Sequence, residues 1–193
     1  MRRNSVYNVV FRRKRKNLTN YRKRLKILAS KRPRLVVRKS LKSIQASIVD
    51  YNKNGDIAKA SSHSENLKKF GWNYGTGNIP AAYLTGFLLG KKAREAKIEE
   101  AILDIGLQKS VNGSRIYAVL AGAVDAGLKI PHNPDVLPSK ERLSGAHISN
   151  YAKHLKENDL LAKKQFNSYI KNKIGPEDIE KNFEDVKRNI IKL

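Results

Sequence analysis

A chain of 193 residues with 40% hydrophobic side chains is long enough for one domain with extensions, or for two small domains, and can build a core. Its formal net charge of +23 indicates a polyanionic partner, either nucleic acid or an anionic membrane. The absence of cysteine excludes disulfides and thiolate zinc sites, and the apolar stretches fall short of the roughly 20 residues that span a membrane.

A membrane partner is further disfavoured by the sequence around the basic segments. No apolar signal core follows the first basic residues, so we expect no export signal. The basic segments also lack a lipidation motif and a broad apolar face, which a peripheral membrane anchor would need. We therefore predict nucleic acid as the partner, and no membrane.

The basic charge is concentrated in the first quarter of the chain. Residues 1–49 hold 17 Lys or Arg and no acid, whereas the rest of the chain holds 23 bases and 17 acids. One basic run is often only a solvated surface or a flexible tail, but here aromatic and hydrogen-bonding side chains lie among the bases. Arginine pairs with phosphates in a bidentate fork, and tyrosine stacks on unpaired bases.

Residues 1–33 are therefore predicted to form a basic RNA-binding arm, which we expect to order, at least partly, only when it is bound to RNA. DNA fits the charge equally well, but the sequence has no zinc finger, no leucine heptads and no clear helix-turn-helix pattern. The predicted RNA contacts of the arm are Arg2, Arg3, Arg12, Arg13, Lys14, Arg15, Lys16, Asn17, Thr19, Tyr21, Arg22, Lys23 and Arg24.

Three strands are predicted next, over residues 34–39, 43–51 and 57–62. In the second strand apolar residues alternate with polar ones, which is the period of a strand with one buried face. Residues 52–56 (NKNGD) predict the turn that follows it. The pattern indicates an antiparallel meander whose wet face or edge is basic. The predicted RNA contacts on this edge are Arg34, Arg38, Lys39 and Lys42.

Two helices, over residues 79–93 and 114–128, are predicted on either side of a fourth strand at 99–106. The glycine-rich loop at 71–78 has neither the GxxxxGK nor the GxGxxG spacing of nucleotide sites, and its Trp72 and Tyr74 are interpreted as core or loop anchors. Gly86 and Gly90 are expected to let the first helix pack closely on the sheet. The order β-β-β-α-β-α predicts an α/β fold, a mixed sheet with helices packed on it.

Beyond residue 130 the sequence predicts a helical C-terminal extension. Residues 132–139 are rich in Pro, Asn and Asp and form a loop, and polar helices are expected at about 147–174, whole or broken near Asn158, and at 176–190. Their apolar residues are expected to pack on the domain or on a neighbouring protein. The chain thus divides into an arm (1–33), a globular α/β domain (34–130) and a loop with a helical extension (131–193).

No arrangement of residues predicts catalysis. Glu99 and Glu100 are adjacent and would point to opposite faces of a strand, and Ser62 beside His63 lacks the context of a nucleophile elbow. The histidines have no acidic partners at the spacing of metal ligands; they are His63, His132, His147 and His154. We predict a binding protein rather than an enzyme, with no catalytic residue, metal, cofactor or small-molecule substrate.

Four stretches resemble one family in the same order. They are residues 17–24 (NLTNYRKR), 33–40 (PRLVVRKS), 122–132 (GAVDAGLKIPH) and 142–148 (RLSGAHI), and they look like parts of the archaeal and eukaryotic-type large-subunit ribosomal protein of the L-eighteen family. The resemblance covers about residues 1–155. The last 35 or so residues match by helical character more than by motif.

The resemblance implies a β-β-β-α-β-α fold and a structural role in the cytoplasm, in the large ribosomal subunit. It implies binding to 5S rRNA, attachment of that RNA to the large rRNA in the central protuberance, and neighbouring ribosomal proteins that include the L-five family. The segment after residue 131 and the short total length point to the archaeal branch. Two alternatives stay open: a general RNA chaperone or RNA-processing subunit, and an enzyme built on the α/β domain.

Overall fold

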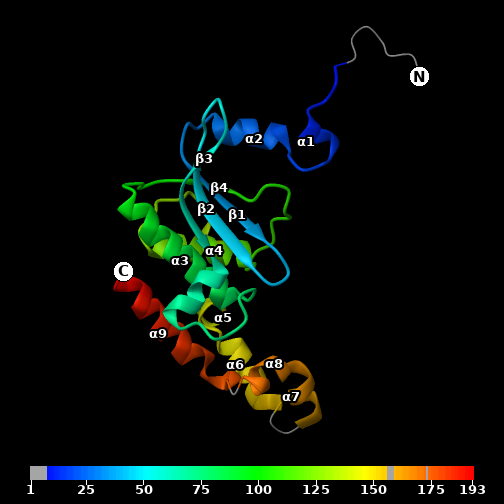
Figure 1. The fold of residues 1–193 in the computed structure, drawn as a ribbon, viewed down its shortest axis with the longest axis vertical. Coiled ribbons are helices and arrows are strands. Elements are labelled where there is room, and N and C mark those ends of the chain that lie inside the picture. The colour runs from blue at the N-terminus through cyan, green and yellow to red at the C-terminus, as the bar shows by residue number, and fades with distance from the viewer. Residues whose placement is uncertain (1–7, 156–158, 173) are drawn as a thin grey trace, which may run out of the picture.

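A four-stranded mixed sheet lies at the centre of the computed structural model, which describes residues 8–155, 159–172 and 174–193 (Figure 1). The strands are β1 (Arg34–Lys39), β2 (Ile44–Asp50), β3 (Ile57–His63) and β4 (Ile102–Asp104), in the order β3-β2-β1-β4. β1 pairs antiparallel with β2 and parallel with β4, and β2 pairs antiparallel with β3. The predicted antiparallel meander and the mixed sheet are confirmed.

The fourth strand is shorter than its predicted range of 99–106. It pairs with β1 over three residues, and Gly106 follows it with a φ of 62°, in the left-handed region that ends a strand. Glu100 forms only an isolated bridge with Lys129. The prediction was too long because the apolar residues, from Ala101 to Ile105, extend beyond the three that pair with β1.

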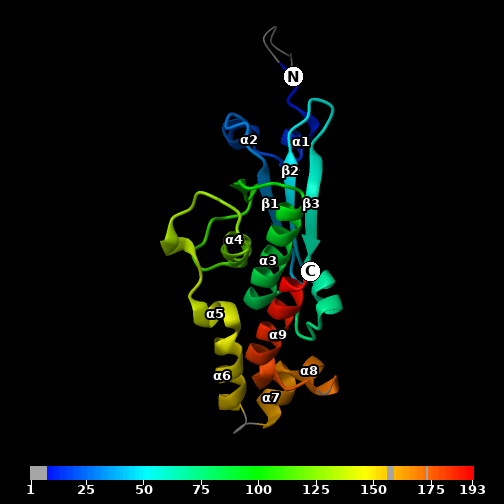
Figure 2. The same cartoon turned by 90° about the vertical axis from the view of Figure 1, so that its left-hand side faces the viewer.

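Two helices cover one face of the sheet: α3 (Ile79–Glu95) and α4 (Arg115–Asp125) (Figure 2). Alternate strand residues such as Leu35, Val37 and Ile48 are fully buried beneath them. The side chain of Asn78 caps α3 by accepting a hydrogen bond from the Ala81 backbone amide. Both predicted helices are confirmed, with ends that differ by up to three residues.

The role of the helix glycines differs from the prediction. Gly86 and Gly90 were expected to bring α3 close to the sheet, but they face α4. A methyl group at Gly86 would lie 2.8 Å from the carbonyl carbon of Val119, and one at Gly90 would lie 2.5 Å from the side chain of Ala126. Gly122 of α4 faces α3 in the same way, against Phe87. The small residues therefore set the distance between the two helices.

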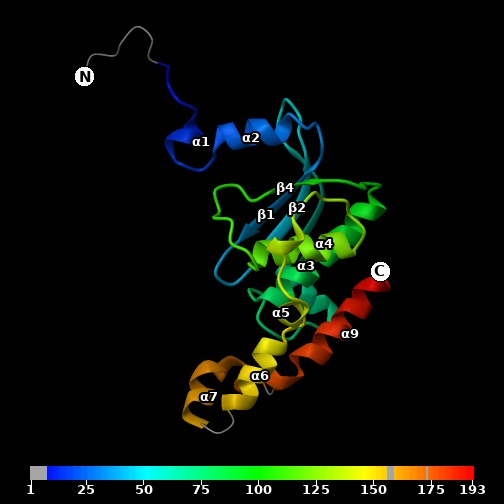
Figure 3. The ribbon, with the colours of Figure 1, turned by 180° about the vertical axis from the view of Figure 1, so that it is seen from behind.

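The C-terminal region is helical, as predicted, but more divided. It contains η2 (Pro134–Val136), α5 (Lys140–Ser144), α6 (Ala146–Leu155), α7 (Asp159–Gln165), α8 (Asn167–Lys171), η3 (Pro176–Asp178) and α9 (Ile179–Ile191). The predicted helix at 147–174 is thus three shorter ones, and Asn158, where a break was expected, lies outside the described residues. Figure 3 shows α7 at the end of the molecule opposite the N-terminal helices.

The last helix is part of the main core. Ile179, Phe183, Val186 and Ile190 lie on one face of α9, are buried, and join the core cluster that includes α3. The loop before α3 helps to hold this region, because the hydroxyl of Tyr74 donates a hydrogen bond to the Gly175 carbonyl at 2.6 Å. The interpretation of Trp72 and Tyr74 as buried anchors is confirmed, since they are 1% and 6% exposed.

Candidate RNA-binding surface

The N-terminal arm folds into two short helices, α1 (Arg12–Arg15) and α2 (Tyr21–Leu28). The turn between them is fixed locally: Asn17 adopts a φ of 52°, and the Arg13 Nε donates to the Thr19 hydroxyl at 2.8 Å. The side chain of Asn20 then caps α2 by accepting a hydrogen bond from the Lys23 amide. Of the predicted arm residues, Arg2 and Arg3 lie outside the described residues.

The outer cations of the arm have no carboxylate partner within the described chain. Neither α1 nor α2 buries a residue, and all four residues of α1 are basic and exposed. The exposed cations of the arm that have no ion pair among the described residues are Arg12, Arg13, Lys14, Arg15, Lys16, Arg22, Lys23, Lys26 and Lys31. Arg13 keeps its hydrogen bond to Thr19. The other groups need no internal side-chain bond broken before they contact phosphate, so they can bind a polyanion directly.

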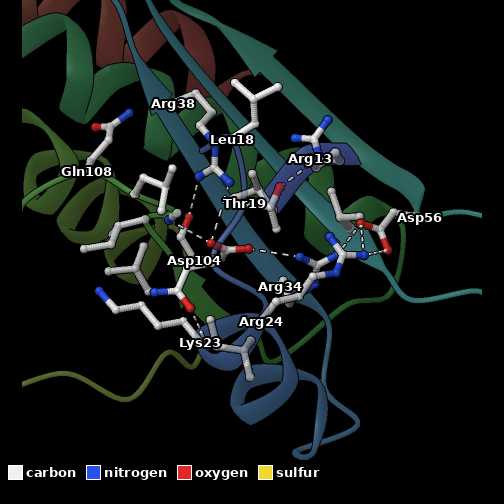
Figure 4. Close-up of a pocket in the computed structure, with 18 of the residues that line it drawn as sticks. Arg13, Leu18, Thr19, Lys23, Arg24, Arg34, Arg38, Asp56, Asp104 and Gln108 are labelled. Carbon is white, nitrogen blue, oxygen red and sulfur yellow. Dashed lines mark hydrogen bonds and ion pairs between the residues drawn. The ribbon is translucent and has the colours of Figure 1, made fainter. Parts of the chain in front are cut away.

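The base of the arm is held to the sheet by arginine–carboxylate pairs (Figure 4). Arg24 of α2 donates to both carboxylate oxygens of Asp56 at 2.8 Å, and Arg34 of β1 donates to the same carboxylate at 2.6 Å. The other side of the Arg34 guanidinium donates to Asp104 of β4 at 2.9 Å. Two carboxylates thus connect the arm, the β2–β3 turn, β1 and β4.

The electrostatics of this network favour the ionised carboxylate. Partial burial raises the pKa of Asp56, but the hydrogen bonds and positive charges of Arg34 and Arg24 outweigh it and hold the pKa below its usual value. Asp56 therefore stays charged at physiological pH and keeps both arginines in place.

Arg34 was expected on the basic wet face, and its placement corrects that expectation. It is 2% exposed, because α2 and the β2–β3 turn cover this end of the sheet and Asp56 and Asp104 satisfy its charge. Arg38, four residues further along the strand on the same face, is 45% exposed in its side chain and donates to the backbone oxygens of Val37 and Asp104. Arg34 therefore positions the arm rather than presenting a free cation.

A hollow of about 740 Å³ lies between the arm and the outer face of the sheet. Apolar side chains of the strands contribute to its lining, and cationic and amide side chains from the arm surround them. An unpaired base can pack on the apolar side chains of such a hollow while the phosphate of the same nucleotide contacts the cations. Its lining residues include Val36, Val49, Ala58, Leu103, Lys23 and Gln108.

The predicted strand-edge residues do not form one group. Arg34 and Arg38 both contact Asp104, whereas Lys39 and Lys42 are exposed at the end of β1 away from the arm and have no such contact. Lys39 lines a separate hollow with Arg115 and other residues near the start of α4.

Sequence reasoning missed the two acids that organise the site. The sequence pattern places Asp56 only in a turn and Asp104 only in a strand. The available signal for Asp56 was its position as the second acid after a 49-residue stretch that has none; Asp104 had no such signal, and nothing in the sequence shows which arginines either acid contacts.

No sign of a metal site or of a membrane span is present in the ranges that the structure describes. There, no three His, Cys, Asp or Glu side chains come together as metal ligands would, and no helix combines the length and apolarity needed to cross a bilayer.

Comparison with known families gives a match over the arm and the α/β domain. The model of a family described as ribosomal large subunit proteins 60S L5, and 50S L18 matches residues 5–99 and 91–133. The matched ranges contain both arm helices, the whole sheet, α3 and α4, and they end before α5. They cover more than half of the chain.

Proposed function

The chain belongs to the family of ribosomal large subunit proteins 60S L5 and 50S L18, and from that premise we propose that it binds 5S rRNA and attaches it to the large rRNA in the central protuberance. Membership makes it a structural ribosomal protein that associates with rRNA in the large subunit of the cytoplasmic ribosome. The choice of 5S rRNA, and a neighbour from the L-five family, are the finer parts of the proposal.

The observation that carries the proposal is the separation of the arm's cations into two groups. The outer cations of α1 and its flanks are free of carboxylates, whereas Arg24 is paired with Asp56. The unpaired cations of α1 and its flanks can contact RNA, and the pairing of Arg24 with Asp56 fixes the position of the arm that carries them. A protein that only needed to attract RNA would not need the second group.

Base selectivity requires something besides phosphate contacts, which carry little sequence information. The hollow beside α2 supplies a place for an unpaired nucleotide, and Tyr21, half-buried beside Phe11 with ring centroids 5.2 Å apart, offers an aromatic face nearby. We therefore propose that RNA shape and one or more splayed bases, rather than a paired helix alone, decide which RNA is bound.

The test is binding of the full chain to a 5S rRNA transcript with excess transfer RNA as competitor. A variant that neutralises α1 is compared with a control that removes the same number of charges far from the arm. The α1 variant carries Arg12→Gln, Arg13→Gln, Lys14→Gln and Arg15→Gln, and the control carries Lys68→Gln, Lys69→Gln, Lys163→Gln and Lys164→Gln.

The full chain should bind 5S rRNA in the presence of transfer RNA. Losing four phosphate contacts should make the salt dependence shallower, with the magnitude of the slope of log K against log salt reduced by about 3. The control should leave this slope nearly unchanged. If transfer RNA competes equally well, the protein is a general RNA chaperone or processing subunit and the 5S proposal is wrong. If the α1 variant and the control behave alike, the arm is not the RNA-binding element.

A further inference from the structure

A second basic hollow, of about 520 Å³, lies at the far end of β1, between the starts of α3 and α4 and the segment that enters α6. Three cationic side chains line it, and none of the described residues that line it is an acid. Lys39 and Arg142 are exposed and have no ion pair in the described part of the chain. The cations are Lys39, Arg115 and Arg142, and His147 lies with them.

Some residues that line this hollow carry buried polar atoms without partners. Among the described residues, seven buried side-chain nitrogen or oxygen atoms make no hydrogen bond, and three of them belong to residues that line this hollow. They are Asn78 Nδ2, Ser114 Oγ and His147 Nδ1. A buried polar atom without a partner is unfavourable, so a group that enters the hollow and hydrogen-bonds to them is favoured.

The hollow is built by tertiary contacts rather than by one loop. One guanidinium nitrogen of Arg115 donates to the backbone oxygens of Ser40 and Gly77, at 3.1 and 2.8 Å, and ties the start of α4 to two other segments. Gly77 is tightly enclosed, since a methyl group there would lie 2.8 Å from the Leu41 oxygen.

The two helix ends add to the positive potential of the hollow. α3 has 17 residues and α4 has 11, and both begin at its wall. Asn78 uses its side-chain oxygen to cap α3, which leaves its amide nitrogen as a donor. Ser114 at the start of α4 makes no side-chain capping bond, so its hydroxyl is also available. Helix N-termini favour anions because their amides and dipoles point outward.

We propose that this hollow holds a backbone phosphate of ribosomal RNA, with Lys39 and Arg142 as charged ligands and Asn78 and Ser114 as uncharged donors. The inference rests on the proposed function, because it takes RNA as the source of the phosphate. It adds a second anchor to the arm. The six residues of β1 separate Arg34 from Lys39 by roughly 17 Å along the strand, so one phosphate cannot serve both ends.

The experiment maps phosphates that the full chain protects from ethylation, first on a 5S rRNA transcript and then on a large-subunit rRNA transcript. The wild-type protein is compared with the Lys39→Gln/Arg142→Gln variant, with Ser114→Ala, and with the control Lys163→Gln/Lys164→Gln. Because the Ser114 hydroxyl has no partner, its removal should leave the urea midpoint unchanged, so a loss of binding is not a loss of folding.

The double variant should lose protection of one or two phosphates and bind at least about 10-fold more weakly to the RNA that contains them. Ser114→Ala should weaken binding to the same RNA by about 5-fold, the value of one hydrogen bond. The RNA in which protection is lost identifies the source of the phosphate. Unchanged protection on both RNAs, with affinity within 2-fold of the control, overturns the inference.

The arm variant separates this inference from the proposed function. If neutralising α1 abolishes 5S preference while the double variant has no effect, only the second anchor is wrong. If transfer RNA competes equally with 5S rRNA but the double variant still loses a protected phosphate, the 5S assignment is wrong and the anchor stands.

Discussion

Replacing Gly122 with alanine should destabilise the protein through the contact between α3 and α4. A methyl group at this position would lie 2.8 Å from the Phe87 amide nitrogen, on a rigid helix backbone. Ordinary contacts between such atoms are about 3.5–4.0 Å, so the two helices must separate by roughly 1 Å. Neither side can yield by rotating a side chain, because backbone faces backbone.

The magnitude follows from two opposing effects. Overpacking a close contact costs about 1–3 kcal/mol, and a contact between two backbones belongs near the upper end. Alanine recovers about 1 kcal/mol over glycine inside a helix. The net loss should therefore be about 2 kcal/mol, which corresponds to a Tm about 4–8 °C lower for a chain of this size.

Urea unfolding followed by tryptophan fluorescence measures this loss directly. Trp72 is the only tryptophan and is 1% exposed in the same core cluster, so its emission reports unfolding of that core. Gly175→Ala is the matched control, since a methyl group there meets only the flexible side chain of Asp178. A Gly122→Ala variant no less stable than the control would refute close backbone packing of the two helices.

Three further variants test the network and the C-terminal helix. Asp56→Asn should cost about 2 kcal/mol near neutral pH, because two arginines lose a charged acceptor. Since the folded pKa of Asp56 is lowered, its contribution is present above about pH 4 and is lost as the pH falls below that value, so wild type and variant should converge in acid. Tyr74→Phe should cost about 1 kcal/mol by removing the hydrogen bond to Gly175, and it should remove a tyrosine that titrates at a pKa of about 12, raised mainly by burial. Phe183→Ala should cost about 3–5 kcal/mol as a cavity in the main core, measured by the same urea titration.

Each of these variants has an outcome that contradicts its reasoning. A pH-independent difference for Asp56→Asn would mean that the carboxylate charge does not matter. For Tyr74→Phe, an alkaline titration of tyrosine absorbance that is the same as in the wild type would show that the raised pKa belongs to another tyrosine. Near-wild-type stability of Phe183→Ala would place α9 outside the cooperative core.

The regular elements could be predicted because their signals are local. Alternation across Ile44, Ala46 and Ile48 fixes both the strand and its buried face, and the charge-free run before Lys91 indicates a buried helix. The stripe of apolar residues on α9 is also visible at helical spacing. The sequence left two partners open for it, the domain or a neighbouring protein, and α9 packs on the domain, where it returns to α3 across a long, irregular segment.

The candidate site was predicted by type and not by arrangement. Basic residues in the arm are identifiable from charge alone, but the sequence cannot distinguish a free arginine from a paired one. Arg24 pairs with Asp56 across 32 positions and Arg34 with Asp104 across 70, and no periodicity links such residues. The gathering of Lys39 and Arg142 at one hollow is equally invisible, because it depends on how α5 packs beside α3.

The distribution of acids explains how so basic a chain can fold and still bind RNA. After residue 49 the bases exceed the acids only modestly, 23 to 17, so self-repulsion within the α/β domain is limited. Asp56 and Asp104 neutralise the arginines that are needed to dock α2, and leave those of α1 unpaired. Docking α2 in advance reduces the conformational entropy that RNA binding must otherwise overcome, and full charge is kept where phosphates arrive. A carboxylate beside α1 would reverse both effects, by competing with phosphate for the cations that the RNA uses.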